Sequence, residues 1–433
     1  MKTKSRPLIG LLAIALLWCW RVPLNAQTAP QDGRYFERQA VQAYRNKDFP
    51  AYLANLQRAL ALRPNHPRLL YNLAGGYALN GKTEEGLQSL ARVAAMGLAY
   101  PFEQDDDLAS LRETESYRRV SEQFARNRAP LIRSEAAFTI PQKGLIGESV
   151  VFDPKTRSFY VASVRQRKII KVGATGRAED FATEKDGLWS VFGLKIDARR
   201  RLLWACTTAT PQMWHQNAAD KGLSGLLKFD LRTGRLLQKY VIADRANEHW
   251  LGDLTLTRNG DVYATDSVKP AIYLLRAGGG QIEKFYTHDS FVNLQGLAFS
   301  PDERRLFVAD YAQGVWAIDM QTKQTELLAA PPDTTMLGLD GIYFYRNRLL
   351  AVQNGVNPQR VVEFELSKDW RRVERLNVLE ANHPAHDELT LGALNGNDFY
   401  YIANAQWWSV NDDGQEITPE KLQNLKILRL RLP

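Results

Sequence analysis

The sequence predicts a multidomain α+β chain in which a short α-helical repeat array precedes an all-β six-bladed β-propeller. Two observations support this prediction. Six copies of one phrase stand between Glu148 and the C-terminus, each with a Gly- or Asp-containing turn, a short apolar strand, a polar turn and a second strand rich in Val, Tyr and Ala. Residues 35–128 instead carry apolar side chains at helical spacing.

Each copy of the phrase predicts one four-stranded blade, because successive copies start roughly 43 to 60 residues apart. In every copy, two short runs rich in apolar residues are separated by a polar turn. The six copies begin at Ile146, Val191, Leu251, Leu294, Leu339 and Leu389.

The first residues have the composition of a secretory signal peptide. Lys2, Lys4 and Arg6 precede the apolar run 8–20, and a small-residue cleavage site ends at Ala26. We expect residues 1–26 to be removed and the protein to be exported, to the periplasm or the extracellular space. The alternative is an uncleaved N-terminal anchor, but the apolar run is shorter than the ~20 residues that a spanning helix needs.

Composition limits the class of protein and its partners. With 45% hydrophobic and 24% charged residues among 433, the chain has ordinary globular composition. Removal of residues 1–26 takes away four basic residues and no acidic one, so the formal net charge falls from +8 to +4. This charge is too small and too dispersed to indicate nucleic-acid binding. Of the two cysteines only Cys206 remains, and we expect it to be a buried apolar residue without a disulfide partner.

The helical segment shows an internal repeat of 34 residues, since the turn Lys47–Phe49 recurs as Gly81–Thr83. Leu73, Ala74 and Tyr77 match the tetratricopeptide pattern, so the segment resembles that family over about two repeats. A third, looser helical unit follows the acidic run 105–107. Such an array is either a packing cap for the propeller or a groove that binds a protein or peptide. The predicted domains are thus 1–26, 35–128 and 134–433.

The two ends of the propeller predict how its ring closes. Residues 136–140 form a strand-like run before the first blade, and Ile427–Leu432 alternates with a period of two after the last blade phrase. A ring left open would expose an unpaired strand edge. We therefore expect these two segments to pair in one blade.

The inner strands of a propeller line its central channel, so residues at their starts converge on one end of the channel. This convergence can build a ligand site from residues that are far apart in the sequence. The residues at this position are, blade by blade, Glu148, Phe192, Gly252 with Asp253, Gln295, Asp340, and Thr390 near Glu388.

The strings Gly147–Asp153, Leu294–Asp302 and Leu339–Ile342 resemble the superfamily of six-bladed propellers that includes senescence marker protein, gluconolactonase and strictosidine synthase. The resemblance covers about residues 134–433, and its phrases are specific for the superfamily rather than for one activity. It implies a catalytic calcium or other divalent ion, held by a Glu of the first blade, Asn residues of middle blades and an Asp that also acts as base in lactone or ester hydrolysis. Glu148 matches that Glu, and Asp340 matches that Asp.

The middle blades depart from the pattern of the superfamily. Gln295 stands where an Asn is usual, Gly252 replaces an Asn while Asp253 is kept, and Phe192 puts an apolar ring where a polar group is expected. A calcium ion needs about six to eight oxygen ligands, of which the remaining residues supply about four. The alternatives are a divalent-ion site and a polar plug without an ion. The candidate metal ligands are Glu148, Asp253, Gln295 and Asp340.

Histidines supply further candidates for acid–base chemistry. His249 and His386 directly precede inner strands, so His386 joins Asp340 as a candidate catalytic residue if the protein is an enzyme. The stretch 206–225 is the longest insertion that the sequence pattern shows between two blade phrases. Its Trp214 and His215 are candidate ligand contacts.

Three functions remain, because the sequence contains no serine-hydrolase elbow, phosphate-binding loop or zinc-protease motif. We expect an exported two-domain binding protein, in which the channel takes up a small molecule or peptide and the helical repeats contact a protein. The alternative is a divalent-metal-dependent hydrolase of lactones or esters. A purely structural role is the third. The propeller fold by itself does not decide between them.

Overall fold

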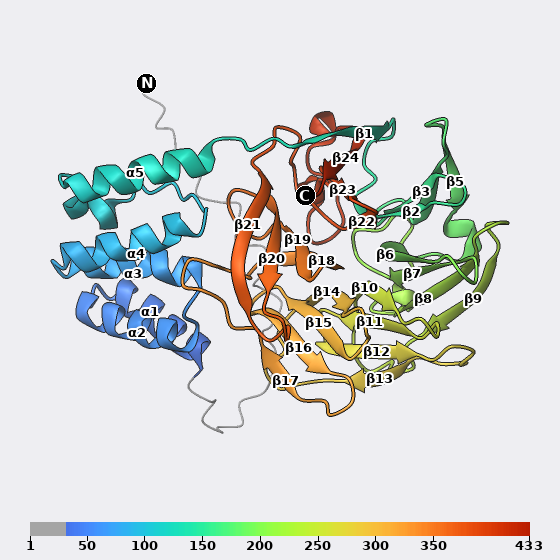
Figure 1. Cartoon of the computed structure of the whole chain (residues 1–433), viewed down its shortest axis with the longest axis horizontal. Coiled ribbons are helices and arrows are strands. Elements are labelled where there is room, and N and C mark those ends of the chain that lie inside the picture. Colours follow the sequence, from blue (N-terminus) through green and yellow to red (C-terminus); the bar gives the residue numbers. More distant parts are fainter. Residues whose placement is uncertain (1–31) are drawn as a thin grey trace.

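The computed structural model describes residues 32–433, so the predicted signal peptide lies outside the described residues. Its N-terminal part is a helical array (Figure 1). No helix within residues 32–433 has the length and apolar character needed to cross a membrane. The helices are α1 (Gly33–Arg45), α2 (Phe49–Leu62), α3 (Pro67–Leu79), α4 (Thr83–Ala95), the 3₁₀ helix η2 (Asp106–Leu111) and α5 (Glu115–Arg128).

Side-chain caps define where these helices begin. Asp32, Asp48 and Thr114 accept hydrogen bonds from backbone N–H groups in the first turns of α1, α2 and α5. The helices pack in antiparallel pairs around two apolar clusters, one centred on Leu56 and the other on Leu90. The looser third unit is a 3₁₀ helix followed by α5, and Asp105 caps the 3₁₀ helix.

The rest of the chain forms six four-stranded antiparallel sheets around a common centre. Figure 1 looks down this centre, with the inner strands nearest to it and the helical array beside blade 5. Blade 1 has strands β2 (Gly147–Asp153), β3 (Ser158–Ser163), β4 (Lys168–Val172) and β5 (Ala178–Ala182). Blade 2 has β6 (Ser190–Asp197), β7 (Leu202–Thr208), β8 (Ser224–Asp230) and β9 (Leu236–Val241). Blade 3 has β10 (Leu251–Leu256), β11 (Val262–Asp266), β12 (Ala271–Leu275) and β13 (Glu283–Tyr286).

The remaining blades follow the same order, from the inner strand outward. Blade 4 has β14 (Leu294–Phe299), β15 (Arg305–Asp310), β16 (Gly314–Asp319) and β17 (Thr325–Leu327). Blade 5 has β18 (Leu339–Tyr345), β19 (Arg348–Gln353), β20 (Arg360–Leu366) and β21 (Val373–Ala381). Blade 6 has β22 (Gly392–Asn395), β23 (Asp398–Ile402), β24 (Leu425–Arg431) and, as its outer strand, β1 (Ser134–Ile140). The predicted six-bladed propeller behind a helical array is confirmed.

The first and last strands of the propeller close its ring. β1 pairs antiparallel with β24, from Ser134 opposite Leu430 to Ile140 opposite Leu425, with one irregularity near Ala136. β24 in turn pairs with β23, so the strand that ends the chain lies between the strand that starts the propeller and the rest of blade 6. The predicted pairing of the two ends is therefore confirmed.

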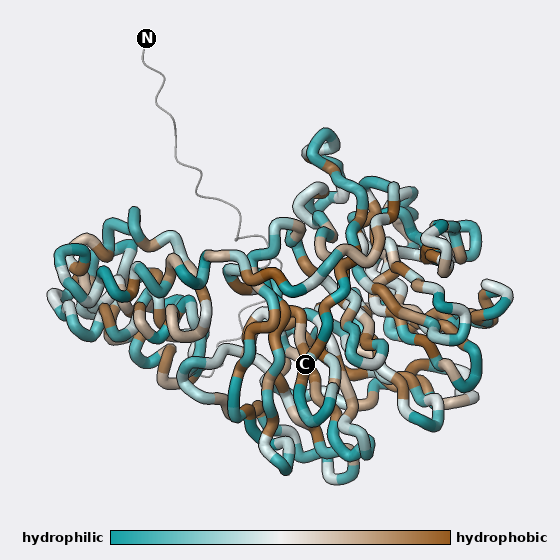
Figure 2. The backbone as a smooth tube through the Cα atoms, turned by 45° about the horizontal axis from the view of Figure 1, so that its top comes forward, coloured by the Kyte–Doolittle hydropathy of each residue, from teal (hydrophilic) through white to brown (hydrophobic). Residues whose placement is uncertain are grey.

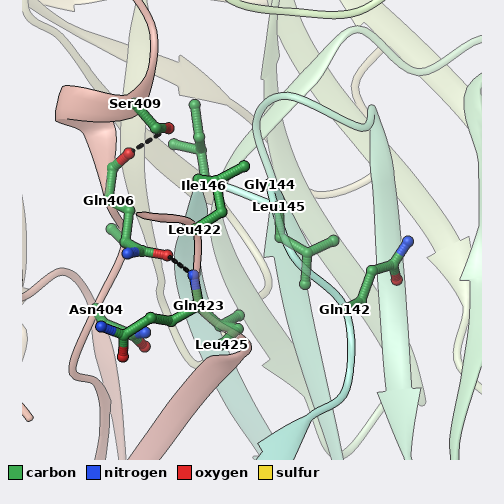
Figure 3. Close-up of a pocket in the computed structure, with 11 residues that line it drawn as sticks. Gln142, Gly144, Leu145, Ile146, Asn404, Gln406, Ser409, Leu422, Gln423 and Leu425 are labelled. Atoms are coloured by element: carbon green, nitrogen blue, oxygen red, sulfur yellow. Dashed lines mark hydrogen bonds between the residues drawn. The ribbon is translucent and has the colours of Figure 1, made fainter. Parts of the chain in front are cut away.

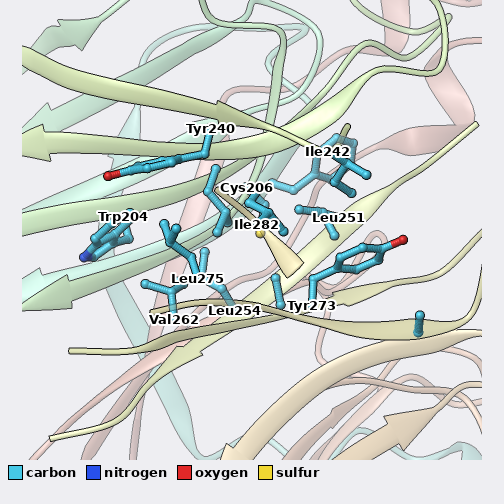
Figure 4. Packing of buried hydrophobic residues seen from close by; sticks show 14 of the residues in the cluster. Trp204, Cys206, Tyr240, Ile242, Leu251, Leu254, Val262, Tyr273, Leu275 and Ile282 are labelled. Atoms are coloured by element: carbon cyan, nitrogen blue, oxygen red, sulfur yellow. The ribbon is translucent and has the colours of Figure 1, made fainter. Parts of the chain in front are cut away.

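Apolar side chains fill the space between neighbouring blades. In Figure 2 the hydrophobic residues run along the strands, and the turns between strands are largely hydrophilic. Figure 4 shows one such contact, where Trp204, Cys206 and Tyr240 of blade 2 face Leu254 and Tyr273 of blade 3. Cys206 is fully buried and free, and burial raises the pKa of its thiol well above the ordinary value, which makes it unreactive.

An ion pair joins blades 1 and 2 at the end of the ring where the inner strands finish. The Arg201 guanidinium donates to both carboxylate oxygens of Asp153, at 2.7 and 2.6 Å. The Thr156 hydroxyl donates to the same carboxylate, whose side chain is 0% exposed. Hydrogen bonds from Arg201 and Thr156 lower the pKa of Asp153 to about 2. Two parallel charged hydrogen bonds make this a strong contact between blades.

The helical array docks on blade 5 through the loop between β19 and β20 and the end of β21. The Ala99 N–H donates to the Asn357 carbonyl, and Leu131 forms a β-bridge with Ala381. At the centre of this junction the Arg360 side chain, 0% exposed, donates from Nη1 to the Met96 carbonyl at 2.7 Å. Burial lowers the pKa of Arg360 to about 9. Within residues 32–433, its side chain donates to Gln353 and Met96 and forms no ion pair with a carboxylate.

The closure of the ring predicts how the propeller unfolds. Deletion of residues 425–433 should abolish the cooperative thermal transition of the whole propeller, because it leaves two strand edges unpaired in blade 6. Calorimetry of the deletion and of Arg429→Ala, a change on the exposed side of β24, would compare the two effects. We expect Arg429→Ala to keep a single transition. A deletion variant with full cooperativity would contradict the ring assignment.

The ion pair between blades 1 and 2 predicts an acid-sensitive contribution to stability. Asp153→Asn should lower the free energy of unfolding by about 2 kcal/mol, since it removes hydrogen bonds to a charged group. The folded-state pKa lies below the ordinary one, so this contribution is present above about pH 4 and is lost as pH falls toward pH 2.

Denaturant titrations of wild type and variant at neutral and acidic pH would measure this difference. Glu115→Gln is the control, because Glu115 pairs with Arg119 on the exposed surface of α5 and should contribute little. Equal effects of the two substitutions would show that the buried pair does not stabilise the contact between blades.

Candidate functional site

Five of the six inner strands start with the same irregularity, which aims side chains into the channel. In β2, the pairing advances from Gly147 to Val150, while the partner strand advances by only two residues. The same single extra residue occurs in β6, β10, β14 and β18. A bulge of this kind leaves residues out of the ladder and re-aims their side chains. The residues inside the five bulges include Glu148, Phe192, Asp253, Gln295 and Asp340.

Neighbouring inner strands approach closely at these bulges. A Cβ on Gly193 would lie 2.7 Å from the Cα of Asp253, and one on Gly296 would lie 2.6 Å from the Asp340 carbonyl oxygen. Only glycine fits such contacts with a neighbouring backbone. The close approach brings the carboxyls of separate blades into one region of the channel.

The end of the channel where the inner strands start is called the mouth here. Glu148 lies at this mouth and contacts the aromatic side chain of Trp407. The Trp407 indole N–H donates to Glu148 Oε2 at 3.0 Å. The Trp407 ring stacks on Phe192 at 6.4 Å between centroids, and Phe192 in turn meets the Trp250 ring edge-on at 5.2 Å. Trp250 and Trp407 remain partly exposed. Glu148 thus stands beside a wall of three aromatic rings.

A short chain of hydrogen bonds holds Asp340. The Asn354 amide donates to Asp340 Oδ2 at 3.1 Å and to the Leu389 carbonyl at 2.6 Å. The Tyr311 hydroxyl donates to Oδ1 of the Asn354 side chain at 3.1 Å. Tyr311 therefore fixes the orientation of the amide that contacts the carboxyl.

Asp253 is the most unusual group in the channel. Its residue is 2% exposed, and neither carboxylate oxygen has a hydrogen-bond partner within residues 32–433. The backbone N–H groups of Leu254 and Leu297 lie near enough to lower its pKa but complete no hydrogen bond. Burial dominates and raises the pKa. Such a group destabilises the folded chain unless another molecule satisfies it.

Lys195 and Tyr343 follow the bulge residues along β6 and β18 and contact each other, and we call this pair the floor of the channel. The Lys195 ammonium stands 5.1 Å from the centre of the Tyr343 ring, and the Tyr343 hydroxyl accepts a hydrogen bond from the Gly392 N–H at 2.6 Å. Because blades 2 and 5 are opposite each other in a ring of six, the contact between Lys195 and Tyr343 crosses the channel. The positive charge of Lys195 lowers the pKa of Asp253.

The carboxyls at the mouth raise one another's pKa. Burial and then the negative charge of Asp340 raise the pKa of Glu148 well above its ordinary value, and Asp253 and Glu388 add to this. Burial and then Asp253 raise the pKa of Asp340 to about 7. Burial raises the pKa of Glu388 to about 7. The mouth thus holds several poorly solvated carboxyls with raised pKa values. Such groups are typical of functional sites.

The residues present do not form a compact metal site. Within residues 32–433, no three His, Cys, Asp or Glu side chains are arranged to hold a metal ion. One oxygen of Glu148 already accepts from Trp407, and one of Asp340 accepts from Asn354. The amide of Gln295 donates to Asn293 at 2.6 Å. The donor set of the four candidate metal ligands, as they lie here, does not fit a calcium ion.

The histidines lie apart from this acidic group. His249 is buried in blade 3, where Nδ1 lies 2.6 Å from Asp266. His386 Nε2 contacts the Tyr401 hydroxyl at 3.0 Å, and that hydroxyl donates to Glu380. Burial lowers the pKa of His386 to about 4, so it is neutral at neutral pH. The structure therefore does not bring His386 into contact with Asp340.

The predicted contact loop of blade 2 also stays away from the carboxyls. His215 is 72% exposed at its side chain and contacts Glu184 at 2.7 Å. Trp214 lies on the surface. The guanidinium carbon of Arg165 stands 5.9 Å from the centre of the Trp214 ring. Arg165 Nη1 donates to the Gly414 carbonyl at 3.0 Å, so this loop meets a second loop over blade 1.

That second loop, residues 403–424 of blade 6, is longer than the loop 209–223 of blade 2. It is therefore the longest insertion in the propeller, which corrects the sequence-based expectation for 206–225. Figure 3 shows how it is held: the Ser409 hydroxyl donates to the Gln406 carbonyl, and the Gln423 N–H donates to the Gln406 side chain. The pocket there has a volume of about 10 Å³, enough for one water molecule. The loop supplies Trp407 to the channel rather than a ligand cavity of its own.

The chain is therefore a six-bladed β-propeller protein with an N-terminal helical array and an acidic, aromatic channel mouth. Among solved structures it is similar to a gluconolactonase from Xanthomonas campestris, with 14% identity, 69% of this chain and 95% of that chain covered, and a TM-score of 0.46. It is also similar to the calcium-binding protein regucalcin from Agrobacterium tumefaciens, with 15% identity, 69% and 96% covered, and a TM-score of 0.47.

A third similar structure is a virginiamycin B lyase from Staphylococcus aureus, with 11% identity, 68% and 98% covered, and a TM-score of 0.46. No protein-family model matches the sequence, and no curated protein matches it. The fold of this chain follows from its own six sheets.

The unpartnered carboxyl of Asp253 predicts a substitution that stabilises the protein. Asp253→Asn should raise the melting temperature, because it removes a buried carboxylate that has no hydrogen-bond partner. Each kcal/mol gained in the free energy of unfolding corresponds to a rise of about 2–4 °C. The gain should shrink as pH falls, since the wild-type carboxyl is then neutral as well.

Asp266→Asn is the matched control for this prediction. Asp266 is equally buried, but accepts hydrogen bonds from the N–H groups of Trp250, Val268 and Lys269 and contacts His249. Its substitution should therefore lower the melting temperature. Thermal denaturation of both variants in parallel would measure the two signs, and a loss of stability in both would show that Asp253 is satisfied in solution.

Proposed function

We propose that the chain is a two-domain binding protein whose channel mouth takes up a small molecule or a peptide segment. The observation that supports this proposal most directly is the pair of unpartnered oxygens of Asp253. Keeping a buried carboxyl without a partner lowers stability, and functional sites are where proteins retain such groups. The partly exposed aromatic wall of Trp250 and Trp407 supplies apolar contact area for a ligand beside it.

The helical array has the second role in this proposal. Its ends dock on the propeller through Arg360 and Leu131, and the remaining surface of α1 exposes Val41 and Tyr44. We assign to this surface a contact with a partner protein, without nucleic acid and without a membrane span. Export of the mature chain is part of the same proposal and rests on the N-terminal sequence.

The channel role can be tested with the tryptophans that line it. Binding at the mouth should change the fluorescence of Trp407 and Trp250, because both rings stand beside the carboxyls. A screen of small polar molecules and short peptides on the full chain should find compounds that change this fluorescence and raise the melting temperature. Asp253→Asn should abolish both effects. A compound that acts equally on wild type and on Asp253→Asn binds elsewhere.

Calcium gives a prediction of its own. The donor set at the mouth does not converge, so calcium should change the melting temperature by less than about 1 °C, whereas a ligand at a hundredfold excess over its Kd stabilises by about 2.7 kcal/mol. Differential scanning fluorimetry with calcium and with a chelator would measure this. A large calcium-dependent rise that Glu148→Gln and Asp340→Asn each abolish would contradict the prediction.

A hydrolase of lactones or esters is the second candidate, favoured by the pKa of Asp340. A carboxyl with a pKa of about 7 can both accept and donate a proton at neutral pH, which is what general acid–base catalysis requires. Asn354 would keep this carboxyl in place while a bound carbonyl compound reacts with water.

A panel of lactones and esters, assayed with Asp340→Asn as the inactive control, would test the hydrolase. We expect Asp340→Asn to abolish any hydrolysis and Tyr311→Phe to reduce it more mildly, since Tyr311 contacts Asn354 and not the carboxyl. Hydrolysis that survives in Asp340→Asn would exclude this role for Asp340.

A further inference from the structure

The mouth of the channel holds four carboxyls for which residues 32–433 supply no ion-pair partner. Glu148, Asp253 and Asp340 interact electrostatically with one another, and Glu388 adds a fourth carboxyl. No Lys, Arg or His within residues 32–433 forms an ion pair with any of the four. Their side-chain donors are neutral, an indole for the first and a carboxamide for the third.

Among the described residues, Lys195 is the basic residue whose charge acts on Asp253. The ammonium of Lys195 lowers the pKa of Asp253, but it stands over the Tyr343 ring on the floor of the channel and forms no ion pair. A second cation beside the carboxyls would favour their charged form, which burial and mutual repulsion disfavour. The site therefore favours a cation that enters from the mouth.

The aromatic rings at the mouth favour an organic cation over a metal ion. Phe192, Trp250 and Trp407 form a continuous wall beside Glu148. Aromatic faces attract ammonium and guanidinium groups but are not ligands for calcium or magnesium. The described carboxyls do not converge as metal ligands, whereas N–H donors of an organic cation can reach carboxyls that stand apart.

We propose that the channel mouth binds the ammonium or guanidinium group of an organic molecule, with Asp253 as its buried anchor and Trp407 as its aromatic cover. This inference rests on the proposed ligand-binding role of the channel. The N–H groups of the cation donate to the two free oxygens of Asp253, and Glu148 and Asp340 accept on either side. No covalent step is involved.

The cationic group can belong to a free amine or to a Lys or Arg side chain of a polypeptide. The helical array docks on the same end of the propeller as the channel mouth. Its contacts go to the loops 311–313 and 354–359, through the Ala312 and Asn357 carbonyls. The neighbouring Tyr311 and Asn354 belong to the hydrogen-bond chain that holds Asp340. The junction of the array with the propeller therefore lies beside the residues that hold Asp340.

Calorimetric titration of the full chain can test the inference with matched probes. The probes are agmatine as a free guanidinium compound, a short peptide with one central lysine, and the same peptide with norleucine in place of that lysine. We expect the lysine peptide to bind at least about tenfold more tightly than the norleucine peptide, because only lysine supplies the charge. Asp253→Asn should weaken the binding of the lysine peptide by a similar factor. Glu115→Gln on α5 should leave it unchanged.

The outcomes separate the inference from the proposal on which it rests. Agmatine binding as tightly as the lysine peptide identifies a free amine as the source, and tighter binding of the peptide identifies a polypeptide. Equal binding of the lysine and norleucine peptides, lost in Asp253→Asn, would keep the channel as a binding site and overturn the cation. Displacement of the cationic probes by calcium at a lower concentration would overturn it in favour of a metal site. Failure of both cationic probes to bind would overturn it as well.

Discussion

The pairing of β1 with β24 is the constraint on which the rest of this structure depends. Six separate sheets are arranged in a ring only because the segment 134–140 hydrogen-bonds to the last strand of the chain. This closure fixes the inner strands relative to one another, so that Glu148 and Trp407, 259 residues apart, can meet at 3.0 Å. β1 also follows the helical array directly. The buried carboxyl of Glu380 accepts hydrogen bonds from the backbone and hydroxyl of Ser134, which anchors the crossing.

The ring allows a polar site that a smaller core would not support. The apolar clusters between blades supply stability, whereas the acidic mouth has one carboxyl without any partner and others in mutual repulsion. The unpartnered carboxyl and the repulsion among the others destabilise only the channel mouth. Because the blades around it are stable, the carboxyls keep fixed positions. Arg360 is a second buried charge, which lies at the start of β20 in blade 5 and faces the junction with the array.

The periodic parts of this molecule could be predicted from its sequence, because each blade repeats one pattern. The same pattern placed Glu148, Asp253 and Asp340 in the channel. Trp407 could not be placed in this way, since it comes from the irregular loop 403–424. Lys195 was missed for another reason. The extra residue in β6 interrupts the two-residue alternation of strand side chains, so counting from Phe192 does not show which side chain faces the channel.

The histidines illustrate the opposite error. His249 and His386 directly precede inner strands, but a residue just before a strand can face its own blade, as His249 does toward Asp266. The third helical unit agrees with its prediction, because Asp106 and Asp107 lie in the first turn of the 3₁₀ helix η2 and Asp105 caps it. For the histidines, the sequence carries the residue types, and the local turn geometry decides where they point.

The bulges at the starts of the inner strands also affect how this protein can change over evolutionary time. In β10, Gly252 and Asp253 fall between the ladder pairs of Leu251 and Leu254, and the other four bulged strands have the same arrangement. Exchanging the side chain at the position of Phe192, Asp253 or Gln295 need not disturb the strand pairing that builds a blade, whereas Gly193 and Gly296 have to stay glycine. New ligand preferences can therefore arise by single substitutions at this end of the channel while the ring itself stays intact.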